Sequence, residues 1–156
     1  MTHQELLLHQ LFQTVRAVTK GVNWTFENYN LHSSEWAIIT TLKQAGTLTQ
    51  GDLANYLNIE PPAVSRTLGV LINKGLIHRI TGDDKREKLV SLSRKALALY
   101  PILLDISQKH RQSMFAGLSA KQQLDLENSL KTIFDNAQHF IKSQENIQKE
   151  DDSAAV

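Results

Sequence analysis

The sequence of 156 residues predicts a mainly α-helical fold with one small β-hairpin. Two patterns predict it. Apolar residues recur at spacings of three and four over most of the chain, which is the period of an amphipathic helix. Between Ile77 and Leu92 the period changes to two on either side of the turn-forming stretch 81–85, which indicates two paired strands.

The first predicted helix runs roughly from Gln4 to Tyr29, and the stretch 28–30 is its stop. The apolar stripe of this helix is Leu8, Leu11, Phe12, Val15, Val18, Val22, Phe26 and Tyr29. A stripe this long cannot be buried against one small following lobe. The helix therefore needs another long helix or a partner chain.

Two shorter helices are expected next. Ser33 or Ser34 is the predicted cap of the first of them, because short hydroxyl side chains satisfy free amides at helix starts. Its buried face is Trp36, Ile39 and Leu42. Thr49, with Asp52 three residues later, forms a capping box for the second. The stretch 58–60 that follows is long enough only for a tight turn.

Pro61 fits the first turn of a fourth helix, where its missing N–H is not needed. The inner side of this helix is Val64, Leu68, Leu71 and Ile72. The opposite side is Pro62, Arg66, Gly69, Val70 and Asn73, with Ser65 on the flank. The outer face is therefore narrow, with one arginine at its centre. Gly75 can take the left-handed conformation that ends the helix.

Basic residues gather around the hairpin. Its tip carries Lys85, Arg86 and Lys88, which no core requires. From Glu60 to Lys95 eight basic residues stand against four acidic ones, a net charge of +4, whereas nine basic and twelve acidic residues give the rest of the chain −3. This distribution fits a surface that contacts phosphates, or an ordinary solvated surface.

Two helices complete the chain. Ser93 caps one that runs towards Met114, and Pro101 within it should produce a kink or a local break. Ser119 and Gln122 form the capping box of the last helix. Its stripe is Leu126, Leu130, Ile133, Phe134, Ala137 and Ile141. After Ser143 the apolar pattern fades, and residues 143–156 are expected to be a frayed polar tail.

Composition excludes several classes of function. The absence of cysteine rules out disulfides and thiolate metal sites. Six scattered histidines form no metal-binding motif, and we expect no metal and no cofactor. No apolar run reaches the length of a membrane span, so we expect no membrane partner and a cytoplasmic location. Neither a nucleophile elbow nor a phosphate-binding glycine loop is present, and an enzyme is not expected.

Short helix, tight turn, proline-led helix, glycine stop and basic hairpin together predict a winged helix-turn-helix that binds DNA. The stretches LTQGDLANYLNIEPPAVSRTLGVLINKGLIHRI, GDDKREKLVSLS and GLSAKQQ resemble the MarR family of transcriptional regulators, and the resemblance covers about residues 6–141. It implies one domain over 1–156 with a winged-helix lobe at 32–92. It also implies dimerisation helices at 1–31 and 93–142, and a homodimer on a palindromic operator in double-stranded DNA.

The resemblance also implies a set of DNA contacts. Those in or near the major groove are Pro62, Ala63, Ser65, Arg66 and Thr67. Those expected at phosphates or in the wing are Ser33, Ser34, Thr49, Gln50, Arg79, Asp84, Lys85, Arg86 and Lys88. Arg86 would enter the minor groove, oriented by Asp84. Arg66 either pairs with a guanine or contacts a phosphate, and Arg79 serves either packing or a phosphate.

The chain departs from the family pattern where the fourth helix begins. Relatives often place Ser, Thr or Asp at the cap of this helix, whereas this chain has Glu60, a poor cap. Pro61 and Pro62 follow, and this pair removes two N–H donors that could have met phosphate. The operator sequence therefore cannot be copied from relatives.

A small aromatic effector is the expected regulator, because many relatives bind one between their helical and winged lobes. The candidate ligand-binding residues are Trp24, Phe26, Tyr29, His32 and Trp36, each of which could equally be a core residue. A repressor released by this effector is the preferred interpretation. The alternatives are an activator or anti-repressor without a ligand, a winged-helix module that binds protein, and a helical ligand-binding protein whose helix-turn-helix is incidental.

Overall fold

The computed structural model describes residues 2–81 and 88–154. The chain divides into two compact units, Met1–Met114 and Phe115–Val156. Within the described ranges, none of the helices combines the length and the apolar character needed to cross a membrane. The assignment of residues 32–92 to a DNA-binding lobe and of 1–31 and 93–142 to dimerisation stays a prediction.

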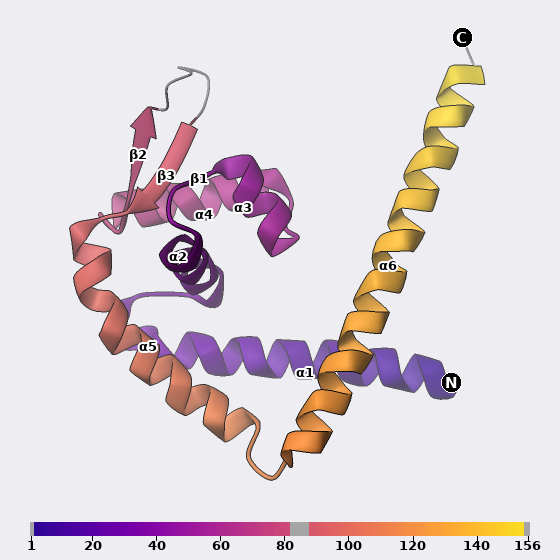
Figure 1. Ribbon diagram of the computed structural model, residues 1–156, viewed down its shortest axis with the longest axis horizontal. Coiled ribbons are helices and arrows are strands. Elements are labelled where there is room, and N and C mark those ends of the chain that lie inside the picture. The colour runs from indigo at the N-terminus through magenta and orange to yellow at the C-terminus, as the bar shows by residue number, and fades with distance from the viewer. Residues whose placement is uncertain (1, 82–87, 155–156) are drawn as a thin grey trace. The chain divides into compact units, whose positions relative to one another are not determined.

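The described part of the first unit holds five α-helices, a 3-10 turn and three strands (Figure 1). In chain order they are α1 (His3–Thr25), η1 (Glu27–Tyr29), α2 (Ser33–Ala45), β1 (Leu48–Thr49), α3 (Gln50–Leu57), α4 (Pro61–Asn73), β2 (Ile77–Thr81), β3 (Lys88–Leu92) and α5 (Arg94–Met114). The mainly helical fold with a small β wing is confirmed. Figure 1 shows α2, α3 and α4 gathered beside the strands, with α5 leading away from β3.

The strands form one antiparallel sheet in the order β1-β3-β2. In the predicted hairpin, Ile77 of β2 pairs with Leu92 of β3, and Arg79 pairs with Val90. Strand β1 was not predicted. Its two residues pair with β3, Leu48 with Val90, so the sequence immediately before α3 becomes the third strand. Two residues carry too little pattern to show a strand, which here exists only through pairing with a distant segment.

The core lies where α2, α3, α4 and the sheet meet. Its fully buried side chains include Ile39, Leu53, Leu68, Leu71 and Val90. The predicted inner face of α4 is confirmed, because Val64, Leu68 and Leu71 are all buried there. Burial of large apolar side chains is the dominant stabilising term in such a fold. The core therefore fixes which face of α4 points outward.

The first helix ends earlier than predicted. Phe26 leaves the helical conformation with a φ of −102° and a ψ of 6°, and its side chain is buried in the core. The 3-10 turn η1 follows, and Asn30 closes it in the left-handed conformation with a φ of 50°. Burial of Phe26 in the core outweighs the helical pattern, so the single helix from Gln4 to Tyr29 was too long.

The start of α2 also differs from the prediction. Its N-cap is His32, not Ser33 or Ser34. The backbone N–H of His32 donates to Oε2 of Glu35 at 2.7 Å, and that of Ser33 donates to Oδ1 of Asn23 at 2.8 Å. The free amides at this helix start are thus satisfied by Glu35, the third residue of α2, and by Asn23 of α1.

The remaining helix signals of this unit hold. Thr49 caps α3 through the predicted box with Asp52, and Pro61 opens α4. Gly75 has a φ of 69° directly after that helix. Ser93 Oγ accepts the N–H of Ala96 at 3.1 Å at the start of α5. Helix α5 runs through Pro101 without the local break that was one expected outcome.

The second unit contains α6 (Ala120–Ala154). Ser119 and Gln122 form the predicted capping box: Ser119 N–H donates to Gln122 Oε1 at 2.9 Å, and Gln122 N–H donates to Ser119 Oγ at 3.3 Å. The helical conformation continues to Ala154, so the frayed tail expected after Ser143 was wrong. The residues there are mostly good helix formers such as Gln, Glu and Lys, which favour a helix without any packing.

Candidate nucleic-acid interface

The helices α3 and α4 are fixed against each other by a short turn. Leu53 and Ala54 of α3 are buried in the core that α4 shares. Asn58 takes the left-handed conformation with a φ of 51°, and the N–H of Ile59 then donates to the Ala54 carbonyl at 3.0 Å. This is the three-residue turn that the sequence predicted. It holds α4 as a rigid element on the surface of the unit.

The outer face of α4 is open to solvent. Its exposed residues are Pro62, Ser65, Arg66, Val70 and Asn73, whereas Ala63 and Thr67 are half-buried. Arg66 stands on this face, and no hydrogen bond or ion pair holds it to any other residue that the structure describes. Thr67 donates its hydroxyl proton to the Ala63 carbonyl at 3.1 Å. Arg66 is therefore free to reach a ligand, and it is the charged side chain among the exposed residues of this face.

The start of α4 follows the expected departure from the family pattern. Glu60 is the N-cap, and its side chain makes no capping hydrogen bond. Pro61 and Pro62 contribute no N–H, so the first amides of the helix belong to Ala63 and Val64, and both donate to the Glu60 carbonyl. The α4 N-terminus therefore offers no free backbone donor to a phosphate in these first positions.

Four candidates for phosphate contacts lie at the starts of α2 and α3. The Thr49 hydroxyl donates to Asp52 Oδ2 at 2.7 Å, which leaves it no proton for a phosphate. This hydrogen bond lowers the pKa of Asp52, and the hydrogen bond from the Thr49 backbone N–H lowers it by a smaller amount. The Gln50 amide donates to the Pro61 carbonyl at 3.4 Å. Ser34 is exposed, and Ser33 is half-buried.

The wing is described up to its strands. Arg79 is exposed on β2, and its neighbour His78 lies 3.0 Å from the Ser91 hydroxyl across the hairpin. Lys88 begins β3. The predicted contacts Asp84, Lys85 and Arg86 lie outside the described residues.

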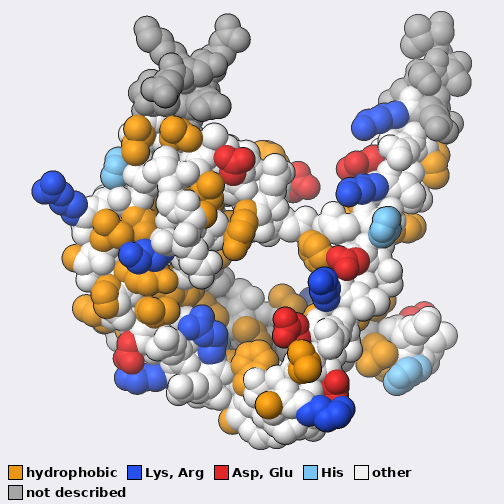
Figure 2. All heavy atoms as spheres, in the orientation of Figure 1, with side chains coloured by type: hydrophobic (Ala, Val, Ile, Leu, Met, Phe, Trp, Pro, Cys, Tyr) orange, Lys and Arg blue, Asp and Glu red, His pale blue; other side chains and the backbone are white. Residues whose placement is uncertain are grey.

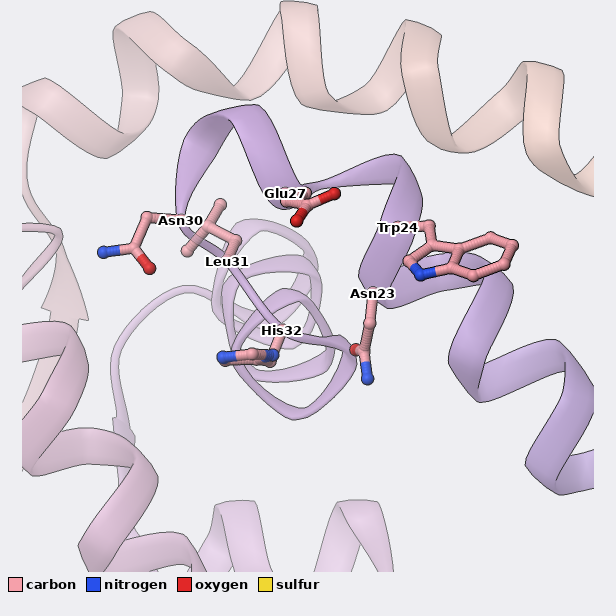
Figure 3. A pocket seen from close by; sticks show the side chains of 6 residues that line it. All are labelled: Asn23, Trp24, Glu27, Asn30, Leu31 and His32. Carbon is pink, nitrogen blue, oxygen red and sulfur yellow. The ribbon is translucent and has the colours of Figure 1, made fainter.

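A hollow of about 360 Å³ lies at the corner between α1 and α2. Its lining is Asn23, Trp24, Glu27, Asn30, Leu31 and His32 (Figure 3). Trp24 is 69% exposed, and Lys20 Nζ lies 5.0 Å from its ring centroid. Of the five predicted ligand residues, the structure brings Trp24 and His32 to this hollow.

The other three aromatic candidates belong to the packed interior. Phe26 and Trp36 are buried with ring centroids 5.1 Å apart. The Trp36 indole N–H donates to Ser107 Oγ at 3.2 Å, which satisfies its one polar atom. Tyr29 is half-buried against the same core. Sequence spacing could not separate these side chains from Trp24, because all of them lie near one helix corner.

A buried ion pair behind the interface was missed by sequence reasoning. Lys74 caps the C-terminus of α4, and its Nζ lies 2.6 Å from Oε1 of Glu35 in α2. Neither Glu35 nor Lys74 is among the predicted site residues. The two residues are 39 positions apart, so no local pattern could pair them. Among the described residues, no group of three or more His, Cys, Asp or Glu side chains could hold a metal ion.

The helix-turn-helix, the sheet and the exposed face of α4 define a winged helix-turn-helix protein. The MarR family model matches residues 31–88. The uncharacterized HTH-type transcriptional regulator YwoH of Bacillus subtilis is 40% identical over 94 residues, which is 60% of this chain and 69% of that protein. The chain belongs to the MarR family of transcriptional regulators, as its sequence motifs indicated, and it is not an enzyme.

Solved structures agree on the fold. A cysteine-to-serine mutant of MarR from E. coli, complexed with operator DNA, has a TM-score of 0.77 at 22% identity and covers 81% of this chain and 92% of its own. The organohalide-sensing regulator RdhR in its 2,4-dichlorophenol bound form has a TM-score of 0.81 at 23% identity and covers 87% of this chain and 82% of its own.

Proposed function

We propose that this protein is a homodimeric repressor that binds a two-fold symmetric DNA operator and is released by a small aromatic effector. The single observation that carries the DNA-binding part is the position of Arg66. It stands exposed at the centre of a narrow outer face of α4, opposite the buried Leu68 and Leu71. Such a helix is narrow enough to enter the major groove.

The proposed role of Arg66 is to read a base. Its guanidinium can donate two parallel hydrogen bonds to O6 and N7 of a guanine, and this contact depends on the DNA sequence. A contact with a phosphate would not depend on the sequence. Pro62, Ala63, Ser65 and Thr67 would lie against the same groove and fix its register. In the wing, Arg79 and the predicted tip residues would contact phosphates and the minor groove.

Exposed apolar stripes on the long helices support the homodimer. On α1 the exposed stripe includes Leu8, Phe12 and Val15, and on α6 it includes Leu130, Phe134 and Ile141. None of the described residues of α6 is buried. Figure 2 shows hydrophobic side chains along α6 between charged ones of both signs. Exposed apolar stripes of this kind mark protein interfaces, and a second copy with the same stripes would cover them.

The hollow at the α1–α2 corner supports the effector. It is lined by one exposed indole and by the polar side chains of Asn23, Glu27 and His32 (Figure 3). Its volume of about 360 Å³ is in the range of small-molecule sites. The similar RdhR structure binds 2,4-dichlorophenol, a small aromatic molecule of the expected class.

The proposed release follows from the spacing of the two α4 helices. Half-sites one helical turn apart lie about 34 Å from each other, so both helices fit only at one separation. A ligand bound in the hollow between α1 and α2 would favour a different separation of the two α4 helices and so weaken DNA binding. Repression in the cytoplasm, relieved by the ligand, is the proposed outcome.

The experiment compares Arg66→Ala with Arg111→Ala, a matched change at an exposed arginine of α5. A duplex that wild-type protein enriches from random DNA is labelled, and fluorescence anisotropy gives the Kd of each protein. Loss of a bidentate base contact should cost about 1–3 kcal/mol, roughly 5- to 150-fold in Kd. Arg111→Ala should bind like wild type, and both variants should keep the wild-type Tm. An unchanged Kd for Arg66→Ala, or wild-type protein that enriches no duplex, would contradict the proposal.

A further inference from the structure

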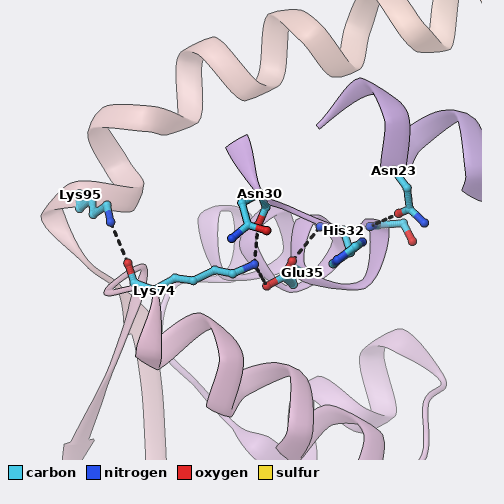
Figure 4. A network of polar contacts seen from close by, with 7 residues as sticks. Asn23, Asn30, His32, Glu35, Lys74 and Lys95 are labelled. Carbon is cyan, nitrogen blue, oxygen red and sulfur yellow. Dashed lines mark hydrogen bonds and ion pairs between the residues drawn. The ribbon is translucent and has the colours of Figure 1, made fainter. Parts of the chain in front are cut away.

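The C-terminal end of α4 is tied to the start of α2 by a buried charge. Lys74, the C-cap of α4, places its Nζ 2.6 Å from Oε1 of Glu35 (Figure 4). The side chain of Glu35 is 3% exposed and that of Lys74 is 21% exposed. The same Nζ also donates to the backbone carbonyl of Asn30. One lysine therefore joins α4 to two points on the chain before and within α2.

The other end of this connection lies at the hollow. The second carboxylate oxygen of Glu35, Oε2, accepts the backbone N–H of His32 at 2.7 Å. Asn30 and His32 both line the hollow. Figure 4 shows Asn30, His32, Glu35 and Lys74 as one continuous set of polar contacts. Each step from the wall of the hollow to the end of α4 is thus a single hydrogen bond or ion pair.

We propose that Lys74 is a positioning residue that couples the hollow to the DNA-contacting helix through Glu35. This inference rests on the proposed function, in which α4 binds DNA and the hollow binds the effector. Apolar contacts between α4 and the core are non-directional and tolerate small sliding movements. A charged pair with little exposure does not tolerate such movements, because separating the two charges leaves one of them unpaired in a poorly solvated place. A ligand that moves Asn30 or His32 therefore moves the end of α4.

Coupling of this kind acts in both directions. If the state of the hollow changes the affinity of α4 for DNA, DNA bound to α4 must change the hollow by the same free energy. The connection can therefore be tested before any natural effector is known. Operator DNA should stabilise the segment 27–32, although no predicted DNA contact lies in that segment.

The chain offers a matched control at Lys95. Its Nζ donates to the backbone carbonyl of Lys74 at 2.8 Å. Lys95→Met therefore removes one positive charge and one hydrogen bond at the same corner, yet leaves the pair of Lys74 with Glu35 intact. Lys74→Met removes the pair itself.

The experiment is amide hydrogen exchange on wild type, Lys74→Met and Lys95→Met, each with and without the enriched duplex. In wild type and in Lys95→Met the duplex should slow exchange several-fold both in α4 and in the segment 27–32. In Lys74→Met it should slow exchange in α4 and leave 27–32 unchanged. Equal slowing of 27–32 in all three proteins, or none in wild type, would overturn the coupling.

A second variant guards against poor folding of Lys74→Met, which leaves Glu35 buried without its cation. The double variant Glu35→Gln with Lys74→Met carries no buried charge, and the amide oxygen of the substituted side chain can still accept the His32 N–H. It should likewise lose the slowing of exchange in 27–32, and retention of that slowing would overturn the coupling. Absence of slowing in α4 itself would contradict DNA binding by α4, and the coupling with it.

A ligand arm uses 2,4-dichlorophenol as the probe and compares the Kd for the duplex with and without it. In wild type and Lys95→Met the probe should weaken DNA binding, and in Lys74→Met the ratio of the two Kd values should return to about one. A probe-dependent Kd that persists in Lys74→Met would overturn the coupling. A wild-type Kd that ignores the probe counts against the proposed aromatic effector, and the exchange experiment then decides the coupling alone.

Discussion

Replacement of Gly21 by alanine should change stability in opposite directions depending on residue 110. Gly21 lies in α1 and faces His110 in α5. A Cβ at position 21 would lie 2.7 Å from Nε2 of His110, too close for any carbon atom. That nitrogen is buried and has no hydrogen-bond partner among the described residues. Packing alone therefore holds the imidazole against the backbone of α1.

The expected magnitude is a balance of two effects. Alanine in place of glycine within a helix gains about 1 kcal/mol of intrinsic helix stability. The added methyl group costs about 1–3 kcal/mol of overpacking. Gly21→Ala should therefore lower the free energy of unfolding by up to about 2 kcal/mol. In a His110→Ala background the overlap is absent, so the same change should raise it by about 1 kcal/mol.

Urea denaturation followed by circular dichroism measures the four free energies of unfolding in this double-mutant cycle. All four proteins are compared at one protomer concentration, because the stability of a dimer depends on it. The interaction between the two sites should be about 1–3 kcal/mol. The same effect of Gly21→Ala in both backgrounds would refute the proposed contact between α1 and α5.

Two further predictions address the helix caps and the dimer. The Thr49 hydroxyl lowers the pKa of Asp52. The Asp52 carboxylate therefore stabilises the fold at pH values above its unfolded-state pKa, which is near 3.8. This contribution is lost as the pH falls through the lower folded-state pKa. Thermal unfolding measures how much less stable Asp52→Ala is than wild type. This difference should be full at neutral pH and should shrink as the pH falls below the unfolded-state pKa. A difference that grows in acid would contradict the prediction. Leu130→Glu, on the exposed stripe of α6, should convert the proposed dimer to monomers in sedimentation velocity, whereas Asn128→Glu on the opposite face should not. Dimers in both variants would argue against α6 as the interface.

Sequence periodicity predicted the two faces of α4, the helix that we propose contacts DNA. The spacing of Val64, Leu68 and Leu71 placed them inside and Arg66 outside, and the structure agrees. Proline and glycine set the limits of α4 by local backbone chemistry, which a sequence carries in full. The inner and outer faces of α4 therefore follow from about a dozen consecutive residues.

Features that depend on distant segments could not be predicted. Strand β1 exists because Leu48 pairs with Val90. Ser33 and Ser34 match the preferred cap types, yet His32 is the N-cap of α2, and Asn23 of α1 accepts the N–H of Ser33. The same limit hid the pairing of Glu35 with Lys74. Each of these outcomes is decided by which side chains the fold brings together.

The candidate ligand site shows the same limit for aromatic residues. Trp24 and Trp36 fit one candidate site equally well in the sequence. In the fold, Trp36 is buried with its indole N–H satisfied, whereas Trp24 stands at the edge of the hollow. Burial separates a core aromatic from one that is free to bind, and burial depends on the whole fold.

The most direct test of the account is the DNA sequence that the protein selects. Wild-type protein and Arg66→Ala are each used to enrich duplexes from a random pool, and the enriched sequences are aligned. Wild type should yield two inverted half-sites centred about one helical turn apart, each with a guanine that becomes variable in the Arg66→Ala selection. Identical sequences from both proteins, or an enriched site without two-fold symmetry, would contradict a dimer that reads DNA through Arg66.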